Sequence, residues 1–279
     1  MKTTIIIPAR LESKRLNRKL LLPGPGNQPL LYFTWKQAVQ SRVDHTYITT
    51  DNTEIAHEAT KFGAEVIMTG HHNCGTNRVA EAYSKIMTPS DDSETECIIN
   101  LQGDEPEIRN KDIDLLIEKF RVGPKINYNN SNQPRMFITT LAVPFHNYFQ
   151  FSKPQNVKVV FDKDDMEAIY FSRGMIPWVD GLHGSIDEWR TSGALPVAYK
   201  HIGIYAYTPE MLQEFANAEA TRLEKIERLE QMRAIENSWP ILVVTVKAPD
   251  DDVLNIWPLG VNTDQDYKLW CKRTKSCQK

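Results

Sequence analysis

The sequence lacks the features that define several large classes of protein. No apolar run approaches the length that crosses a membrane, and the apolar stretch at the amino terminus is shorter than that of a signal peptide. The 4 cysteines form no CxxC pair and no Cys/His spacing typical of zinc sites. We therefore expect a cytoplasmic protein with reduced thiols and no membrane insertion.

The sequence also has no strong excess of charge. It contains 33 Lys and Arg against 36 Asp and Glu among 279 residues, which gives a net charge of −3. This balance provides no general reason to bind nucleic acid or an anionic membrane, so we expect neither as a partner. Any polyanionic ligand must be held by a local cluster of Lys and Arg.

Two glycine-rich nucleotide-binding motifs are absent as well. The chain contains neither Gly-x4-Gly-Lys-Ser/Thr nor Gly-x-Gly-x-x-Gly. The single Gly24-Pro25-Gly26 is typical of a turn rather than of a phosphate-binding loop. No motif therefore supports a kinase or a dehydrogenase.

Strand-like and helical patterns alternate in the first half of the chain. The strand-like runs are residues 3–7, 43–49, 65–68 and 97–101. Helical patterns lie at residues 29–39, 52–62 and 111–120. This order predicts an α/β fold with a mainly parallel central sheet flanked by helices, whose working face lies at the carboxyl ends of the strands.

The second half is less regular and predicts a smaller, mixed β portion. Its strand-like runs are residues 136–144, 157–161, 168–171, 201–207 and 241–246. Helices are predicted at residues 222–236 and from Thr263 onwards, and surface loops at residues 122–134 and 179–196. Because no repeat or low-complexity linker divides the chain, we predict one composite domain over residues 1–279.

The fourth strand-like run ends abruptly in Gln102-Gly103-Asp104-Glu105-Pro106. In an open α/β sheet, an Asp after a strand can hold a hard cation that a phosphate also contacts. Gly103 permits close approach and Pro106 stops the strand. On local pattern alone, a strand followed by an acidic turn explains the same residues, so both interpretations stay open.

A cationic loop follows the first strand. It carries 5 Lys or Arg side chains from Arg10 to Lys19. Neutralising a triphosphate takes several such groups, together with backbone N–H groups and usually a magnesium ion. The loop lies where a phosphate chain would sit, although a solvated basic loop accounts for the charges equally well.

Six segments resemble, in the same order, those of the 3-deoxy-manno-octulosonate cytidylyltransferases, or CMP-Kdo synthetases. They are PARLESKRLNRK at 8–19, CGTNR at 74–78, NLQGDEP at 100–106, YFSR at 170–173, KHIGIY at 200–205 and LEQ at 229–231. The resemblance implies a nucleotide-diphospho-sugar-transferase-like, Rossmann-like fold and a homodimer. It also implies an enzyme that joins CMP from CTP to a small 2-keto-3-deoxy sugar acid and releases pyrophosphate.

The same resemblance divides the chain by role. It assigns residues 1–121 to nucleotide binding, residues 136–246 to sugar binding and dimerisation, and residues 247–279 to a C-terminal loop and helix. It implies Mg²⁺ as the cofactor. The implied catalytic residues are Arg10, Lys19 and Asp104, and the implied metal ligands are Asp104 and Asn262.

Further residues are implied to bind the substrates. On the nucleotide they are Pro8, Ala9, Arg15, Gly75, Thr76 and Arg78. On the sugar acid they are Gln102, Arg173, His201, Tyr205, Glu230 and Gln231. An Arg suits the substrate carboxylate, and Gln, His and Tyr suit its hydroxyls. Structural alternatives remain: a helix-start ion pair for Arg78, a core position for His201, strand packing for Tyr205 and a surface charge for Glu230.

The sequence departs from the family pattern in two places that affect the site. The usual Arg-Leu-Pro-Gly-Lys is Arg15-Leu16-Asn17-Arg18-Lys19, which adds a cation and loses a turn. Asn262 replaces the second metal-ligating aspartate and contributes no charge, so we expect weaker metal affinity. Asp264 and Asp266 lie nearby, where acidic residues ordinarily cap the start of a helix. In the segment 74–78, Cys74 and Asn77 also differ from the usual residues.

Extra length in loops 127–135, 179–196 and 249–258 can reshape the sugar pocket. The leading hypothesis is CMP transfer to Kdo or a close relative. The alternatives are another sugar acid, such as 8-amino-Kdo or a sialic-like acid, another nucleotide, or a binding homologue without turnover.

Overall fold

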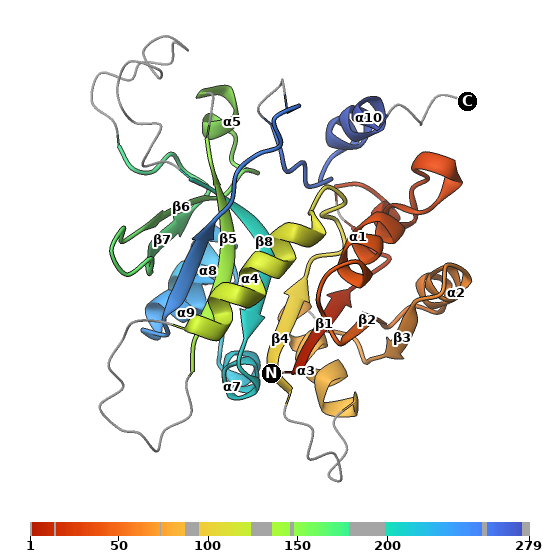
Figure 1. Cartoon of the computed structure of the whole chain (residues 1–279), viewed down its shortest axis with the longest axis horizontal. Coiled ribbons are helices and arrows are strands. Elements are labelled where there is room, and N and C mark those ends of the chain that lie inside the picture. Colours follow the sequence, from red (N-terminus) through yellow and green to blue (C-terminus); the bar gives the residue numbers. More distant parts are fainter. Residues whose placement is uncertain are drawn as a thin grey trace.

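The computed structural model describes residues 2–13, 15–72, 74–86, 95–123, 136–145, 148–178, 199–252 and 256–274. A central sheet of 9 strands runs through it, with helices packed on both faces (Figure 1). The predicted loops at 127–135 and 179–196, and residues 253–255 of the third, lie outside the described residues. None of the described helices is long and apolar enough to span a membrane.

The first half of the sheet is parallel. Its strands lie in the order β3 (Glu65–Met68), β2 (His45–Thr50), β1 (Lys2–Pro8) and β4 (Thr95–Leu101). The helices of this half are α1 (Leu30–Val39), α2 (Thr53–Lys61) and α3 (Gly75–Ile86). Because β1 and β4 are parallel neighbours, the cationic loop after β1 emerges beside the acidic turn after β4.

The second half joins this sheet through antiparallel strands. β8 (Tyr199–Tyr207) pairs with β4 and with β5 (Ile138–Pro144), and β9 (Ile241–Thr245) pairs parallel with β5. β6 (Lys158–Phe161) and β7 (Ala168–Ser172) form a hairpin beside β8. The remaining elements are the helices α4 (Asn110–Val122), α5 (Tyr148–Ser152), α7 (Pro209–Asn217), α8 (Arg222–Glu227), α9 (Met232–Glu236) and α10 (Asp264–Arg273), and the 3₁₀ turns η1 (Lys19–Leu21) and η2 (Pro25–Asn27). The predicted fold class is confirmed.

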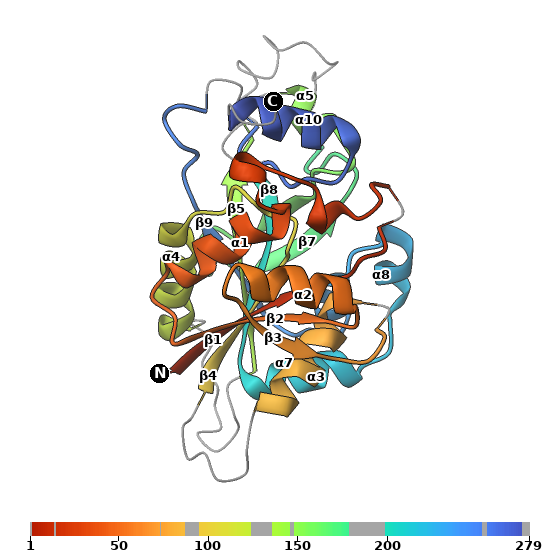
Figure 2. The ribbon, with the colours of Figure 1, turned by 90° about the vertical axis from the view of Figure 1, so that its right-hand side faces the viewer.

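Apolar side chains on both faces of the sheet hold the layers together. In β1, Ile5 and Ile7 face one cluster with α1, α2, α4 and α10, whereas Ile6 faces a second cluster with α3, α7 and α9 (Figure 2). All three isoleucines are fully buried. A buried side chain of this size contributes about 1.5–3 kcal/mol, so β1 is a rigid support for the loop that follows it.

The helix predicted over residues 222–236 was wrong. α8 ends at Glu227, and Arg228 adopts a left-handed conformation with φ 54° and ψ 47°. α9 begins only at Met232, after Leu229 has turned into the core. The break matters for function because Glu230 and Gln231, which lie in the turn between the two helices, line a cavity.

Helix α7 was not predicted at all, although its start carries a recognisable signal. The Thr208 side chain accepts a hydrogen bond from Met211 N, and Pro209 occupies the first helical position. Both features favour a helix start. The other predicted strands and helices are present within a few residues of their expected ends.

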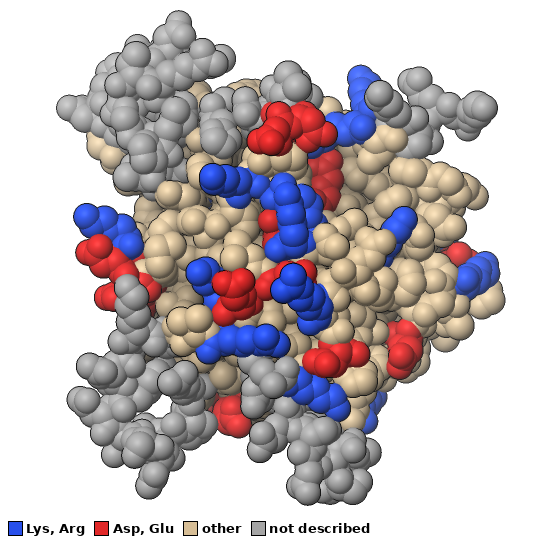
Figure 3. All heavy atoms as spheres, viewed as in Figure 1, with Lys and Arg blue, Asp and Glu red and all other residues tan. Residues whose placement is uncertain are grey.

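Charges of both signs are interleaved on the surface. On the face shown in Figure 3, Lys and Arg lie among Asp and Glu along the middle of the molecule. This distribution agrees with the small net charge of −3.

Candidate active site

Two cavities meet at the carboxyl ends of β1 and β4. The larger has a volume of about 660 Å³ and the smaller about 290 Å³. The two cavities share four lining residues, which are Arg15, Gln102, Asp104 and Asn262. These four therefore lie where a ligand in one cavity would meet a ligand in the other.

The larger cavity is cationic on one side. Arg10, Arg15 and Lys19 line it from the loop after β1, as the sequence predicted for that loop. Lys19 Nζ forms an ion pair with the Asp104 carboxylate. The start of this loop is fixed by backbone contacts. Pro8 ends β1, and the buried Ala9 donates its N–H to Thr49 O at 2.8 Å.

Arg78 is a structural part of this cavity's wall. Its side chain is only 3% exposed, pairs with Asp51 at 2.9 Å and donates to Thr69 Oγ1 at 2.8 Å. Burial raises the pKa of Asp51, but the hydrogen bond and charge of Arg78 lower it by more, so the net pKa is below its ordinary value. The helix-start ion pair considered for Arg78 is therefore present.

At the start of α3, Gly75 lies close to the ends of β1 and β4, with space for a Cβ at ordinary van der Waals distance. A Cβ on Gly75 would lie 3.4 Å from Gln102 Nε2 and 3.5 Å from Pro8 Cγ. The next residue, Thr76, lines the smaller cavity and donates its hydroxyl to Glu230 Oε2 at 2.7 Å. Segment 74–78 thus joins the ends of β1 and β4 to the turn between α8 and α9.

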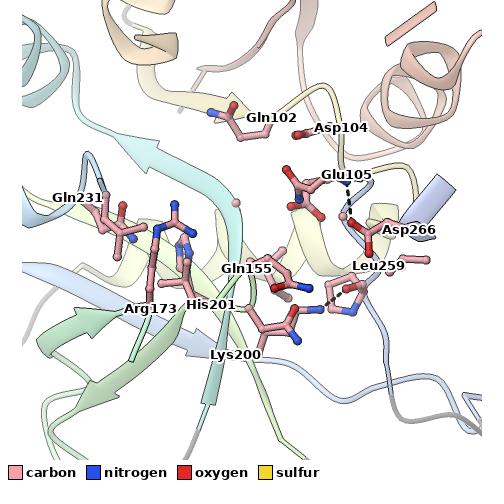
Figure 4. A pocket seen from close by; sticks show the side chains of 18 of the residues that line it. Gln102, Asp104, Glu105, Gln155, Arg173, Lys200, His201, Gln231, Leu259 and Asp266 are labelled. Carbon is pink, nitrogen blue, oxygen red and sulfur yellow. Dashed lines mark hydrogen bonds between the residues drawn. The ribbon is translucent and has the colours of Figure 1, made fainter. Parts of the chain in front are cut away.

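The smaller cavity brings together the predicted sugar-binding residues (Figure 4). They are Gln102, Arg173, His201, Tyr205, Glu230 and Gln231. Gln102 and Asp104 lie on one side in the figure, and Arg173, His201 and Gln231 lie on another. These side chains come from the turn after β4, from β8, from the segment after β7, and from the turn between α8 and α9, which explains why no single sequence segment contains the site.

His201 is neutral in this environment. Burial lowers its pKa to about 3. Its Nε2 lies 3.0 Å from Thr140 Oγ1, and the ring packs edge-on against Phe171 and tilted against Tyr205. Burial also raises the pKa of Tyr205 well above its ordinary value. Both side chains therefore offer hydrogen bonds without charge.

This neutral histidine makes stability depend on pH. The pKa of about 3 lies below that of an unfolded chain, about 6.5, so on acidification the unfolded chain takes up a proton that the folded protein does not. We expect the free energy of unfolding to fall by about 2 kcal/mol between pH 7 and pH 5 from this residue alone. Urea unfolding of the wild type and of His201→Gln measures the effect.

The matched comparison is the slope of unfolding free energy against pH. It should flatten in His201→Gln and stay unchanged in His57→Gln, which alters a histidine on α2 outside both cavities. Equal slopes for the wild type and His201→Gln would show that His201 protonates freely in the folded protein.

Arg173 makes contacts that the sequence did not indicate. Its Nε donates to Glu227 O at 2.9 Å, and its two terminal nitrogens donate to Pro154 O and Arg228 O, each at 3.2 Å. The guanidinium thus ties the end of β7 to the turn that bears Glu230. Its remaining N–H groups are the ones that can meet a substrate carboxylate.

Glu105 and Lys200 are two charged residues among the several lining residues that the sequence did not predict for the smaller cavity. Each is next in sequence to a predicted site residue. Burial first, and then the charge of Asp104, raise the pKa of Glu105 to about 8. Burial lowers the pKa of Lys200, whose Nζ donates to Pro258 O and, at 3.4 Å, to Ile256 O.

Asn262 faces the cationic loop. Its Oδ1 accepts a hydrogen bond from the Arg15 guanidinium at 3.1 Å. Asp266 caps the start of α10 with Thr263, and Asp264 pairs with Lys268 at 2.6 Å on the exposed side. Both acidic residues therefore have the helix-start role expected for them, and neither replaces the missing carboxylate at 262.

Comparisons with known proteins agree with this geometry. A family model described as cytidylyltransferase matches residues 4–244. A 3-deoxy-manno-octulosonate cytidylyltransferase from Pelodictyon phaeoclathratiforme is 38% identical over 270 residues, 96% of this chain and 95% of the relative. A second enzyme of that name, numbered 2, from Actinobacillus pleuropneumoniae serotype 5b is 38% identical over 271 residues, 96% of each chain.

A solved structure is similar over the whole chain. CMP:2-keto-3-deoxy-manno-octonic acid synthetase in complex with CTP superposes with a TM-score of 0.77 at 29% identity, covering 99% of both chains. Fold, site and similarity together define a nucleotide-dependent transferase of the cytidylyltransferase class. The chain belongs to the family of 3-deoxy-manno-octulosonate cytidylyltransferases.

Proposed function

We propose that the protein transfers CMP from CTP to 3-deoxy-manno-octulosonate and releases pyrophosphate. The observation that carries this proposal is the meeting of two chemically different cavities at Arg15, Gln102, Asp104 and Asn262. The cationic cavity suits a triphosphate, and the smaller cavity, where the Arg173 guanidinium accompanies the uncharged His201 and Tyr205, suits a hydroxylated acid.

The chain's own residues support this chemistry by position and charge. The anomeric hydroxyl of the sugar acid would attack the α-phosphorus, and the bond to pyrophosphate would break. Arg10, Arg15 and Lys19 would neutralise the phosphate oxygens and the leaving group. On the other side, His201 and Tyr205 would orient the sugar by uncharged hydrogen bonds, and Arg173 would meet its carboxylate.

We also propose that Mg²⁺ is the cofactor and that Asp104 and Asn262 hold it. Both side chains offer the oxygen atoms that this ion prefers. Each of these oxygens already contacts a cation, since Asp104 pairs with Lys19 and Asn262 accepts from Arg15. Among the described residues, no three His, Cys, Asp or Glu side chains are grouped to bind a metal, so phosphate and water oxygens would complete the shell. A bound ion would further neutralise charge on the phosphates.

The Asn262→Asp variant tests the assignment of position 262. Restoring a negative charge should lower the magnesium concentration needed for the half-maximal rate. The change is about tenfold if the added charge strengthens magnesium binding by about 1.4 kcal/mol. The measurement is pyrophosphate release against magnesium concentration. Asp264→Asn, a change to an exposed carboxylate, is the control. An unchanged requirement in Asn262→Asp would remove residue 262 from the metal site.

A panel of acids tests the proposed reaction. Pyrophosphate release from CTP is measured with 3-deoxy-manno-octulosonate, 8-amino-substituted octulosonate and a nine-carbon sialic-like acid. Activity with the first supports the proposal, and activity with only a nine-carbon acid overturns the substrate. Binding of CTP without release for any acid would instead identify a binding homologue.

We propose, further, a cytoplasmic homodimer. Support for the dimer comes from large apolar side chains that are exposed by 44–80%, namely Phe149, Ile169, Met175 and Trp178. Support for the compartment comes from the sequence, in which the 4 cysteines are widely scattered and form no CxxC pair. Sedimentation of the wild type and Trp178→Glu tests the dimer: the wild type should sediment as a dimer and the variant as a monomer.

A further inference from the structure

Residues 256–262 form a segment without regular secondary structure, which we call the strap. The strap forms one wall of the smaller cavity and carries Asn262 into both cavities. In Figure 4, Lys200 reaches towards it, and Leu259 lies on the same side of the cavity as Glu105 and Asp266. Because no strand or helix fixes the strap, its position depends on individual hydrogen bonds.

Glu107, in the turn after β4, makes two of those bonds, as many as Lys200 makes from inside the cavity. Its Oε2 accepts from Leu259 N at 3.0 Å, and its backbone oxygen accepts from Trp257 Nε1 at 3.0 Å. Three residues earlier, Asp104 O accepts from Val261 N at 3.0 Å. The turn that bears Asp104 is therefore joined to the strap at three points.

Arg273 on α10 completes the clamp. Its Nε donates to Glu107 Oε1 at 2.8 Å and its NH1 donates to Asp252 Oδ1 at 2.8 Å. The second oxygen of Asp252 accepts from Trp257 N at 2.8 Å. These three charged side chains are mostly buried, so their contacts are less screened than those of surface ion pairs.

Glu107 and Arg273 hold the strap from outside the cavities, whereas the last residue of the strap lines both cavities. Glu107 and Arg273 line neither cavity. Asn262, five residues beyond Trp257, lines both and faces Arg15. A change at Glu107 would therefore reach the site through the strap, and also through the charge that Glu107 exerts on Glu105 and Lys200.

We infer that Glu107 is a positioning residue for the reaction: with Arg273 it clamps the strap and so sets Asn262 opposite Asp104. This role rests on the proposed function. It matters more in this chain than it would with a carboxylate at 262, because an uncharged ligand must be held in place to bind a cation well.

The test compares Glu107→Ala and Arg273→Met with Lys268→Met. Lys268 lies on the exposed side of the same helix and pairs only with Asp264 among the described residues. We expect Glu107→Ala to raise KM for the sugar acid and the magnesium needed for the half-maximal rate, each by about 10- to 100-fold. Kd for CTP measured in EDTA should stay within about twofold, because Arg10 and Lys19 belong to another element.

Two more readouts separate positioning from simple stabilisation. Glu107→Gln keeps an acceptor for Leu259 N but loses the charge towards Arg273, so it should recover part of the sugar-acid KM. Hydrogen–deuterium exchange at Leu259 and Val261 should quicken in Glu107→Ala and not in Lys268→Met. The exchange measurement needs no substrate, so it tests the clamp even if the wild type releases no pyrophosphate.

Failure of the inference and failure of the proposed function look different. No pyrophosphate from the wild type with any acid would overturn the function alone. An active wild type, with a Glu107→Ala variant that only melts earlier and keeps both its sugar-acid KM and its magnesium requirement, would overturn the positioning role. Unchanged exchange at Leu259 and Val261 would overturn the clamp itself.

Discussion

Asp104→Ala is expected to lower kcat/KM for pyrophosphate release by about 10²- to 10³-fold, the cost of losing one preorganised charged group at a reacting centre. Among the described residues, Asp104 is the only carboxylate that lines both cavities. It contacts Lys19, and its backbone oxygen receives the strap's Val261 N. The variant removes the carboxylate but keeps the backbone hydrogen bond.

The fold should survive this change. The side chains of Lys19 and Asp104 are 13% and 21% exposed, so the Lys19 ammonium left behind can still reach water. This pair is less buried than Arg233 and Glu224, so its loss should cost less than the about 3–5 kcal/mol of a broken, fully buried pair. Thermal unfolding checks the expectation, and Asp104→Asn separates the loss of charge from the loss of shape.

Asp264→Ala is the control, because that carboxylate is exposed and outside both cavities. Retention of activity in Asp104→Ala would leave Asp104 as a turn residue, the local alternative that its sequence context allows. Loss of activity together with loss of the folded state would be uninformative for the site, which is why Asp104→Asn is measured alongside. Loss of activity in a folded Asp104→Asn establishes that the charge is required.

The parts of the site that sequence reasoning predicted are those fixed by local pattern and strand order. Ile5 to Ile7 form a short β-branched run, and the run at 97–101 has the same character. Once both are taken as parallel strands, the loops after them must open on one edge of the sheet. The contact of Lys19 with Asp104, 85 residues apart in sequence, also requires β1 and β4 to be neighbours, which the structure shows and the sequence did not predict.

The parts that it did not predict depend on contacts between distant segments. Residues 222–236 are strong helix formers throughout, so nothing local indicates the break at Arg228. Glu107 and Arg273 are 166 residues apart, and no periodicity links them. The three carbonyls around Arg173 are likewise set by tertiary packing, which a family motif does not describe.

Arg233→Met is expected to lower the free energy of unfolding by about 3–5 kcal/mol. Arg233 and Glu224 form a bidentate pair with distances of 2.7 and 2.8 Å, and their side chains are only 6% and 11% exposed. Arg233 also donates to Phe215 O at 2.8 Å and stacks over the Phe215 ring. Removing it leaves Glu224 buried without a cation. Urea unfolding measures the loss.

The double variant Glu224→Met/Arg233→Met shows where the loss comes from. If it arises mainly from the unpaired buried carboxylate, replacing both partners by apolar side chains should recover most of the stability. Lys61→Met is the control, since its pair with Glu58 is exposed and should change stability by about 0.5 kcal/mol or less. A single variant as stable as this control would show that the buried pair contributes little.

The same pair supports the site as well as the fold. Arg233 and Glu224 hold α8 against α9 across the break that presents Glu230 and Gln231 to the smaller cavity. A double variant that regains stability but binds the sugar acid more weakly would therefore separate the two roles. In that case the buried ion pair is kept for the geometry of the turn, because apolar packing alone can hold the helices together but does not fix where the turn between them lies.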